Sequence, residues 1–333
     1  MKKIYFLEKS YIFDASNIND NETSGSDRIL INIVNELSKY KDFDVKVFNK
    51  TTNYKKINNV EWNNLSVLNG SPKADIVIAW SDINLFPNYK CEKYLWSHSV
   101  QSIEKFIRKK QLFPFLKHKP KIILEGDYHY NNRSFFTSLF GKEILKVSAD
   151  YEFINAEVDR NYVPPKNVIF NTRPDRNLNL VLKTWEKIKK SVPKATLYIN
   201  PPFELTDNLR QMDIHLRSKN SKNDLINELK SMKLMINPGH KGEVFCLVAE
   251  EGKAMCVPIV TLGIGSLFER VENNKTGYIC DDINNLAEKS IEILNNDDLY
   301  LKIKSTLYDR RGSRQYFNVV KDLLKILKLT SNE

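Results

Sequence analysis

The chain has 333 residues, of which 41% are hydrophobic and 28% charged, and its formal net charge is +10. This length suffices for two domains with a core each, and the composition excludes an intrinsically disordered chain. No apolar run approaches the roughly 20 residues of a membrane-spanning helix. The four cysteines are scattered, which argues against a disulfide framework or a zinc site. We expect a cytoplasmic protein without a metal, and anionic partners such as nucleotide phosphates, a lipid surface or nucleic acid.

The first half of the chain alternates strands with helices. Residues 3–7 read as a strand, and Leu30, Ile33, Val34 and Leu37 then recur at helical spacing. The loop before this helix contains Gly25 and Ser26, and Ser26 or Asp27 could cap the helix. Further strands are expected at residues 44–48, 74–80, 93–96, 121–124 and 145–147.

Polar residues follow two of these strands directly. His98 comes after the strand 93–96, and Asp127 and His129 come after the strand 121–124. A histidine at the carboxyl end of a strand can donate or carry a proton near a bound ligand. An ordinary loop role remains the alternative for all three residues.

A basic and aromatic stretch covers residues 105–121. It has no acid and seven cations mixed with phenylalanines, namely Lys105, Arg108, Lys109, Lys110, Lys117, Lys119 and Lys121. Such a mixture suits an anionic membrane surface, where each cation contributes about 1 kcal/mol. It would also suit a phosphate backbone, and a solvated helix with its phenylalanines packed inward is the third interpretation.

The alternation restarts after the proline-containing linker Val163–Lys166. A strand at 167–171 leads into a turn with Arg173 and Arg176, and an amphipathic helix begins at Leu178. Two arginines in a strand-to-helix turn can form bidentate contacts with phosphate. Strands at 195–199, 214–216 and up to Ile236, and later helices from residues 283 and 317, complete this half.

Residues 236–260 form one strand–loop–helix–strand unit. The turn Asn237–Gly239 ends the first strand, apolar residues reach helical spacing from Phe245, and the next strand covers 257–262. The loop thus lies at the carboxyl end of a strand, where open α/β sheets bind ligands, and the helix N-terminus offers N–H groups to an anion. Glu243 and Glu251 can accept hydrogen bonds from sugar or ribose hydroxyls, although both could equally be solvated helix residues.

The pattern Glu243-x-Phe245-x-Leu247, followed by Glu251 and Pro258-Ile259-Val260, resembles the signature of retaining GT-B glycosyltransferases of the family 4 type. The resemblance implies an α/β protein in which two Rossmann-like domains face each other across a cleft. Residues 1–162 would form the acceptor-side domain and 163–316 the nucleotide-sugar domain. Residues 317–333 would form a helix that packs back on the first domain.

The same resemblance implies the roles of particular residues. Glu243 would contact the donor sugar, Glu251 the ribose, and the amides near Cys246 and Leu247 the sugar and diphosphate. Arg173 and Arg176 would bind the diphosphate, Gly25 and Ser26 would face the donor from the first loop, and His98 would contact the transferred sugar. The chain departs from the pattern at Cys246, where Gly is usual, at Gly252-Lys253, where Ala-Met is common, and in the compressed spacing of the two arginines.

The implied function is retaining, metal-independent hexosyl transfer from a UDP- or GDP-sugar, without a cofactor, to a glycan or lipid-linked acceptor. A lipid-linked acceptor would place the protein on the inner face of a membrane as a peripheral protein. Two alternatives remain open at this stage. One is glycosylation of DNA bases, suggested by the charge of +10, and the other is a non-catalytic GT-B protein that binds sugar nucleotides or glycans.

Overall fold

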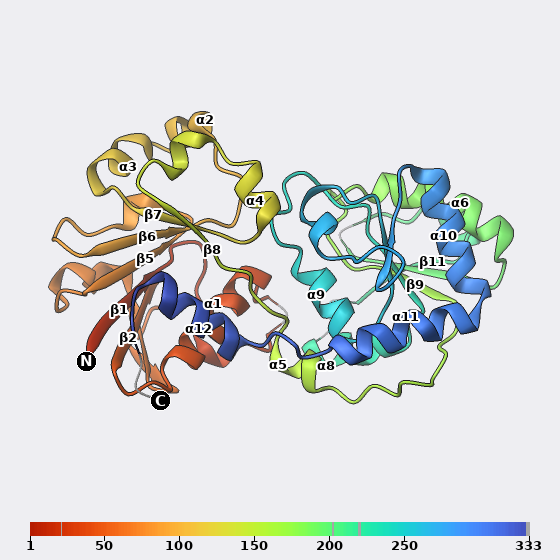
Figure 1. The fold of residues 1–333 in the computed structure, drawn as a ribbon, viewed down its shortest axis with the longest axis horizontal. Coiled ribbons are helices and arrows are strands. Elements are labelled where there is room, and N and C mark those ends of the chain that lie inside the picture. The colour runs from red at the N-terminus through yellow and green to blue at the C-terminus, as the bar shows by residue number, and fades with distance from the viewer. Residues whose placement is uncertain (21, 202, 219–220, 331–333) are drawn as a thin grey trace. The chain divides into compact units, whose positions relative to one another are not determined.

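The computed structural model describes residues 1–20, 22–201, 203–218 and 221–330. The chain forms two compact units (Figure 1). Unit 1 comprises residues 1–147 together with 315–333, and unit 2 comprises residues 148–314. In the described residues, no helix is long and apolar enough to cross a membrane.

Unit 1 is built around an eight-stranded sheet in the order β3-β4-β2-β1-β5-β6-β7-β8. All neighbouring strands are parallel except β3 and β4. The strands are β1 (Lys2–Leu7), β2 (Phe43–Asn49), β3 (Lys55–Ile57), β4 (Val60–Asn64), β5 (Ile76–Trp80), β6 (Glu92–Trp96), β7 (Lys121–Leu124) and β8 (Lys142–Ile144).

Successive side chains along each strand point to opposite faces of the sheet. Helices cover both faces. On one face, Tyr5 and Leu7 share a core with Phe106 and Phe115 of two short helices. On the other face, the Tyr94 hydroxyl donates to a carbonyl of the last helix, at 3.3 Å. The helical elements are α1 (Gly25–Leu37), α2 (Ile103–Arg108), α3 (Leu112–His118), α4 (Asp127–Asn131), α12 (Tyr316–Ile326) and the 3-10 turns η1 (Ala15–Asn17), η2 (Leu65–Gly70), η3 (Ile83–Leu85) and η4 (Phe135–Ser138).

Unit 2 contains a six-stranded parallel sheet in the order β11-β10-β9-β12-β13-β14. Its strands are β9 (Asn167–Phe170), β10 (Thr196–Ile199), β11 (Ile214–Leu216), β12 (Leu234–Ile236), β13 (Ile259–Thr261) and β14 (Gly277–Ile279). Its helical elements are α5 (Tyr151–Asn155), α6 (Leu178–Ser191), α7 (Asp207–Gln211), α8 (Lys222–Lys230), α9 (Leu247–Ala254), α10 (Ile283–Asn295), α11 (Asp297–Arg310) and the 3-10 turn η5 (Gly265–Glu269).

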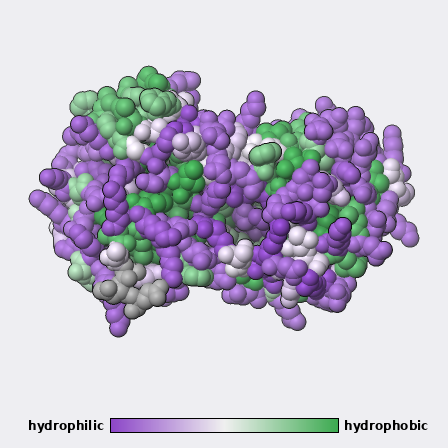
Figure 2. All heavy atoms as spheres, in the orientation of Figure 1, coloured by the Kyte–Doolittle hydropathy of each residue, from purple (hydrophilic) through white to green (hydrophobic). Residues whose placement is uncertain are grey.

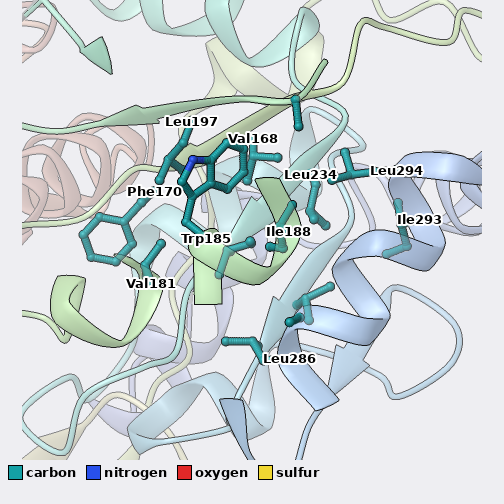
Figure 3. Packing of buried hydrophobic residues seen from close by; sticks show 14 of the residues in the cluster. Val168, Phe170, Val181, Trp185, Ile188, Leu197, Leu234, Leu286, Ile293 and Leu294 are labelled. Carbon is teal, nitrogen blue, oxygen red and sulfur yellow. The ribbon is translucent and has the colours of Figure 1, made fainter. Parts of the chain in front are cut away.

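Trp185 of α6 lies in one of the two cores that flank this sheet. Its buried ring packs among side chains of α6, α10 and strands β9, β10 and β12 (Figure 3). The indole N–H donates to the Met212 carbonyl at 2.9 Å, so the ring's polar atom is satisfied. The opposite face is covered by α8 and α9, because the next residues along the strands, such as Ile169 and Met235, point that way. Both faces of the sheet are therefore buried.

The α/β architecture with parallel sheets is confirmed, but the units divide at residues 147/148 and 314/315, whereas the sequence placed the first boundary at 162/163. Residues 148–162 belong to unit 2 because Phe153 and Ile154 of α5 pack into the core beside α9. The prolines of Val163–Lys166 mark an extended segment inside unit 2. Helix α12 lies in unit 1 and packs against α1. Residues 331–333 of the expected last segment lie outside the described residues.

Candidate functional site

Three loops meet at the carboxyl edge of the unit 2 sheet. They follow β9, β12 and β13, which are neighbouring parallel strands and so end at the same edge. The Asn177 side chain donates to the Gly239 carbonyl at 2.6 Å, and the Ser266 amide donates to the Glu243 carbonyl at 3.0 Å. These bonds tie the loops after β9 and β13 to the loop after β12.

Two glycines allow this close approach. Gly239 has φ +86°, and a Cβ there would lie 2.0 Å from the Ile264 carbonyl oxygen. Gly265 has φ +72°, and its Cβ would lie 2.2 Å from the His240 carbonyl oxygen. Any other residue would have to push a backbone carbonyl away as well as adopt a left-handed conformation.

His240 anchors Arg176. The Arg176 Nη1 donates to His240 Nδ1 at 2.6 Å, and the Gly242 amide donates to the same nitrogen at 3.0 Å. Since Nδ1 accepts both bonds, the neutral imidazole carries its proton on Nε2. Arg173 is held more loosely, because its side chain is 68% exposed and its ion pair is with neighbouring Asp175, at 3.2 Å. No sequence pattern predicts the role of His240, although its position two residues before Gly242 in the loop after β12 could have indicated it.

Glu243 carries a carboxylate that is only partly satisfied. Its Oε2 is buried and has no hydrogen-bond partner within the part of the chain that the structure describes. Burial raises the pKa of Glu243, while the Cys246 thiol and the positive charges of Arg176 and Arg173 act to lower it. A buried carboxylate oxygen without a donor is unfavourable, so a ligand hydroxyl at this point would be bound strongly.

Cys246 stands directly before α9 in the left-handed conformation, with φ 62° and ψ 71°. Glycine adopts this conformation more readily than other residues. This gives a physical reason why glycine is usual at this position in the pattern that the sequence resembles. The helix therefore begins at Leu247, and not at Phe245 as expected from the sequence. The Cys246 side chain makes no capping hydrogen bond, and the Cys246 carbonyl accepts from the Ala249 amide at 3.1 Å. The partial positive charge of the helix N-terminus lies at this edge.

The Cys246 thiol is unsuited to nucleophilic chemistry. Its sulfur is buried and accepts a hydrogen bond from the Asn237 side chain at 3.6 Å. Burial raises the pKa of Cys246 well above its ordinary value, and the negative charge of Glu243 adds to this effect. A thiol that stays protonated is a poor nucleophile, and its contribution here is packing beneath Glu243.

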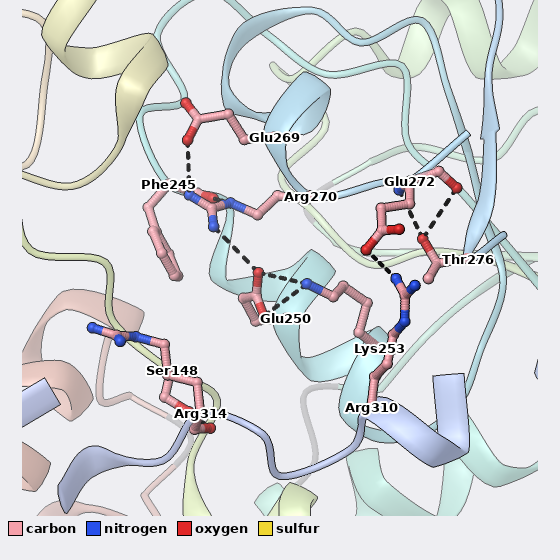
Figure 4. A network of polar contacts seen from close by, with 10 residues as sticks. All are labelled: Ser148, Phe245, Glu250, Lys253, Glu269, Arg270, Glu272, Thr276, Arg310 and Arg314. Atoms are coloured by element: carbon pink, nitrogen blue, oxygen red, sulfur yellow. Dashed lines mark hydrogen bonds and ion pairs between the residues drawn. The ribbon is translucent and has the colours of Figure 1, made fainter. Parts of the chain in front are cut away.

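Two adjacent acids on α9 have different surroundings. Glu251 is 2% exposed and lies on the buried side of the helix. Glu250 instead forms ion pairs with Lys253 at 3.0 Å and with Arg270 at 3.4 Å (Figure 4). Gly252 lets α9 approach the sheet, because a Cβ there would lie 2.8 Å from the Met235 methyl group. This contact accounts for a glycine where the resemblance leads one to expect alanine.

A polar network supports the helix from the side. The Arg270 guanidinium lies 4.1 Å from the Phe245 ring centroid, and its Nε donates to the Phe245 carbonyl at 2.8 Å. Arg310 pairs with Glu272 in the same region (Figure 4). Arg270, Glu272 and Arg310 line a cavity of about 220 Å³ together with Ser148 and residues 311–314. The network fixes the segment between Glu243 and α9.

His98 lies at the corresponding edge of unit 1, directly after β6. Its Nδ1 is 2.7 Å from Glu125 Oε1, and its ring centroid lies 4.1 Å from that of Trp80. The Nε2 atom is buried and has no hydrogen-bond partner among the described residues. Glu125 is not among the residues predicted from the sequence, although it follows β7 directly, next to the end of β6 in the sheet.

Two predicted residues lie in the first turn of α1. Gly25 and Ser26 are both part of the helix, and the N-cap is Ser24 rather than Ser26 or Asp27. The Ser24 hydroxyl accepts from the Asp27 amide at 3.3 Å, and the Asp27 carboxylate accepts from Ser24 in return. The Ser26 hydroxyl lies one position too late to cap the helix and is 2.9 Å from the Ser24 hydroxyl.

The structure thus divides the predicted site residues between two edges. Arg173, Arg176, Glu243, Cys246, Leu247 and Glu251 belong to unit 2, whereas Gly25, Ser26 and His98 belong to unit 1. Within unit 2, the charges of Arg173 and Arg176 both act on Glu243, so the arginines and this carboxylate are neighbours. The cations of residues 105–121 lie on α2, α3, the turns beside them and β7, also in unit 1.

Comparison with known proteins finds similarity to a family over part of the chain. Residues 168–310 match the family model described as glycosyl transferases group 1. An uncharacterized glycosyltransferase of Methanocaldococcus jannaschii is 25% identical over 231 residues, which are 66% of this chain and 58% of that protein. The chain therefore spans somewhat over half the length of this relative.

Solved structures share the fold over nearly the whole chain. A glycosyltransferase from Rickettsia africae has a TM-score of 0.72 at 14% identity, over 98% of both chains. Anabaena HepE in complex with UDP-glucose has a TM-score of 0.70 at 12% identity, over 98% of this chain and all of HepE. The protein has the GT-B fold, and its residues 168–310 are similar to group 1 glycosyl transferases.

Proposed function

We propose that this protein is a retaining glycosyltransferase that moves a hexosyl group from a nucleotide diphosphate sugar to a glycan or lipid-linked acceptor. The observation that carries the proposal is the edge of unit 2, where the buried Oε2 of Glu243 lacks a donor next to two arginines and the N-terminus of α9. A sugar hydroxyl would satisfy the carboxylate, and a diphosphate would satisfy the cations.

The residues of this edge have complementary roles in the proposal. Negative charge develops on the diphosphate as it leaves the sugar, and preorganised donors stabilise it. Arg176, held by His240 at 2.6 Å, provides a fixed donor, and the exposed Arg173 can turn towards the phosphates. The amides at Cys246 and Leu247 add the partial charge of the helix N-terminus.

Glu243 would orient the donor sugar through its hydroxyls, and Glu251 would bind the ribose. Because Glu251 is 2% exposed, ribose binding requires the surrounding side chains to open. His98 would contact the transferred sugar, and Gly25 and Ser26 would contact the donor. A UDP-sugar is the first donor to test, since HepE was solved with UDP-glucose, and GDP-sugars are the second.

A transfer assay tests the proposal. UDP-, GDP- and ADP-sugars are incubated with the protein and candidate acceptors, and the released nucleotide and the product are quantified. Glu243→Ala and Arg176→Ala should each lower kcat/KM by roughly 100-fold or more with unchanged circular dichroism. Arg160→Ala is the matched control, because Arg160 pairs with Asp309 on the surface of the same unit and should leave turnover intact.

Three outcomes would contradict separate parts of the proposal. Full activity in both site variants would remove the assignment of the edge. NMR of the product should show the anomeric configuration of the donor, and an inverted product would exclude retention. The proposal assigns no metal to the reaction, so turnover should persist in excess EDTA, and its loss with recovery on adding Mg²⁺ or Mn²⁺ would overturn that part.

A further inference from the structure

Six large apolar side chains are exposed on neighbouring short helices of unit 1. Phe113 is 74% exposed and Phe135 81% exposed. Figure 2 shows hydrophobic atoms gathered over α2 and α3. We call this set the apolar surface, and its members are Ile103, Ile107, Phe113, Leu116, Phe135 and Leu139.

The apolar surface does not consist of core residues that have become exposed, because buried aromatic residues hold the elements that carry it. Phe106 of α2 and Phe115 of α3 are fully buried and meet edge to face at 5.3 Å. Phe136 of η4 packs on Phe115 at 5.0 Å, which fixes η4 beside the two helices. Phe106, Phe115 and Phe136 thus point inward and hold the three elements together, as the solvated-helix interpretation requires, but Phe113 and Phe135 do not.

Helical spacing places the exposed side chains of α2 and α3 in pairs on the outer side of each helix. Ile103 and Ile107 are four residues apart on α2, and Phe113 and Leu116 are three apart on α3. Phe135 and Leu139 are exposed at the two ends of η4. The connection between α2 and α3 is fixed from below, since the Gln111 side chain donates to Asp82 at 2.9 Å. The apolar surface is therefore held on a firm base.

Exposed cations accompany these side chains. Of the seven cations in residues 105–121, five are exposed, namely Arg108, Lys109, Lys110, Lys117 and Lys119. Lys105 turns inward to the Ser99 hydroxyl, and burial lowers its pKa to about 8. Lys121 lies 5.4 Å from the Tyr94 ring centroid. The acid of this region, Glu104, is the sole carboxylate between residues 103 and 118.

We propose that α2, α3 and η4 form a docking surface for an anionic lipid bilayer. The apolar side chains would enter the boundary between headgroups and acyl chains, and the five exposed cations would lie at the level of the anionic headgroups. A nucleic acid would use the cations but would leave the exposed isoleucines and leucines in water. Charge and apolar exposure on one face favour the membrane, and docking does not depend on the proposed transfer reaction.

Vesicle co-sedimentation without a sugar nucleotide tests this proposal. The full chain should bind vesicles of phosphatidylcholine with 30 mol% phosphatidylglycerol far more than pure phosphatidylcholine vesicles, and high salt should weaken the binding. Lys109→Ala with Lys110→Ala should lower the partition coefficient roughly 30-fold. Phe113→Ser with Phe135→Ser should lower it to a similar degree while the circular dichroism spectrum stays unchanged.

A control variant distinguishes docking through the apolar surface from nonspecific hydrophobic binding to vesicles. Phe268 is 68% exposed in unit 2, so Phe268→Ser removes a comparable aromatic side chain elsewhere and should not change vesicle binding. Equal binding by the Phe113/Phe135 variant and the wild type would overturn the proposal. So would absent vesicle binding together with tight, salt-sensitive binding of a 20-base-pair DNA duplex, which would assign the surface to nucleic acid. Donor binding at the unit 2 edge should be unaffected in the variants of unit 1.

Discussion

At the scale of single residues, the candidate site contains two unfavourable features, and a ligand would relieve the first of them. Glu243 keeps a buried oxygen without a donor, and Cys246 holds a left-handed backbone conformation that costs a non-glycine residue roughly 1 kcal/mol or more. Neither feature stabilises the fold. Both shape the segment between the loop after β12 and α9, where the proposed sugar and diphosphate bind.

The raised pKa of Glu243 predicts a pH-dependent stability difference. Burial makes the folded protein bind this proton more readily than the unfolded chain does, so stability falls as pH rises above the ordinary value of 4.5. Glu243→Gln removes this titration. We expect the variant to melt at a higher temperature than the wild type at pH 7, with the difference vanishing near pH 4, while transfer is lost.

Thermal melts of both proteins between pH 4 and 8 measure this difference. The control is Glu186→Gln, which changes an exposed glutamate of the same unit and should shift the melting temperature little at any pH. A Glu243→Gln variant that is less stable than the wild type throughout would show that the carboxylate stabilises the fold.

At the scale of elements, a few buried contacts join the loops that follow neighbouring parallel strands. In unit 1, His129 of α4 accepts from the Glu125 amide at 3.2 Å, and its other nitrogen lies 3.0 Å from the Ser99 carbonyl. It thereby links the loops after β6 and β7. In unit 2, Gly239 and Gly265 let the loops after β12 and β13 touch.

The buried His129 predicts acid sensitivity of unit 1. Burial lowers its pKa from 6.5 to about 4, so the neutral ring favours folding above pH 6.5 and this contribution, roughly 3 kcal/mol, disappears as pH falls towards 4. His129→Gln should be less stable than the wild type at pH 7 and should show a flatter stability profile between pH 7 and 4. If urea titrations showed that the stability of the variant changes with pH in the same way as that of the wild type, this assignment would be contradicted.

The close contacts of Gly239 and Gly265 predict that alanine at these positions lowers the stability of the fold far more than alanine at an open glycine position does. Gly239→Ala and Gly265→Ala should each cost roughly 2 kcal/mol or more, because a Cβ meets a carbonyl oxygen at 2.0 and 2.2 Å and the backbone φ is positive. Gly70→Ala is the control, since a Cβ there has no neighbour within 4 Å. Urea denaturation measures all three, and equal stabilities would contradict the close approach of the loops.

The sequence predicts the elements with strong periodicity and misses those defined by tertiary contacts. Leu30, Val34 and Leu37 show α1, and Leu178, Val181 and Trp185 show α6, because one apolar face recurs along each helix. Strands β3 and β4 come from a polar segment and are stabilised by pairing at the sheet edge, which no local pattern reveals.

The candidate site could be predicted only in part for a similar reason. Glu243, Arg173 and Arg176 follow from a local motif, and the structure brings them together at one edge. His240 and Glu125 act on partners far away in the chain, 64 residues in one case and 27 in the other. Their roles depend on which strands are neighbours, and the single sequence does not give that order.

At the scale of the whole molecule, the chain returns to unit 1 at its end. Helix α12 begins at Tyr316, and its buried side chains complete the core of a unit formed mainly by residues 1–147. Unit 2 is continuous in sequence and has cores of its own, one of them around Trp185. The core of unit 1 therefore depends on α12, whereas the cores of unit 2 do not.

Truncation after Arg314 tests this dependence. The truncation removes five buried side chains, those of Tyr316, Val319, Val320, Leu323 and Leu324, and uncovers the part of α1 against which α12 packs. We expect limited proteolysis to cleave unit 1 rapidly while residues 148–314 resist, because unit 2 keeps its cores. Uniform resistance of both units would contradict the assignment of α12 to the core of unit 1.

The central claim is that the edge of unit 2 binds a nucleotide diphosphate sugar through Arg176, Glu243 and the start of α9. Isothermal titration calorimetry with UDP- and GDP-sugars tests it most directly, since it needs no acceptor. We predict binding by the wild type and by Arg160→Ala, and a Kd at least about tenfold higher for Arg176→Ala and for Glu243→Ala. Equal affinity in all four proteins, or no binding of any sugar nucleotide by the wild type, would contradict the claim.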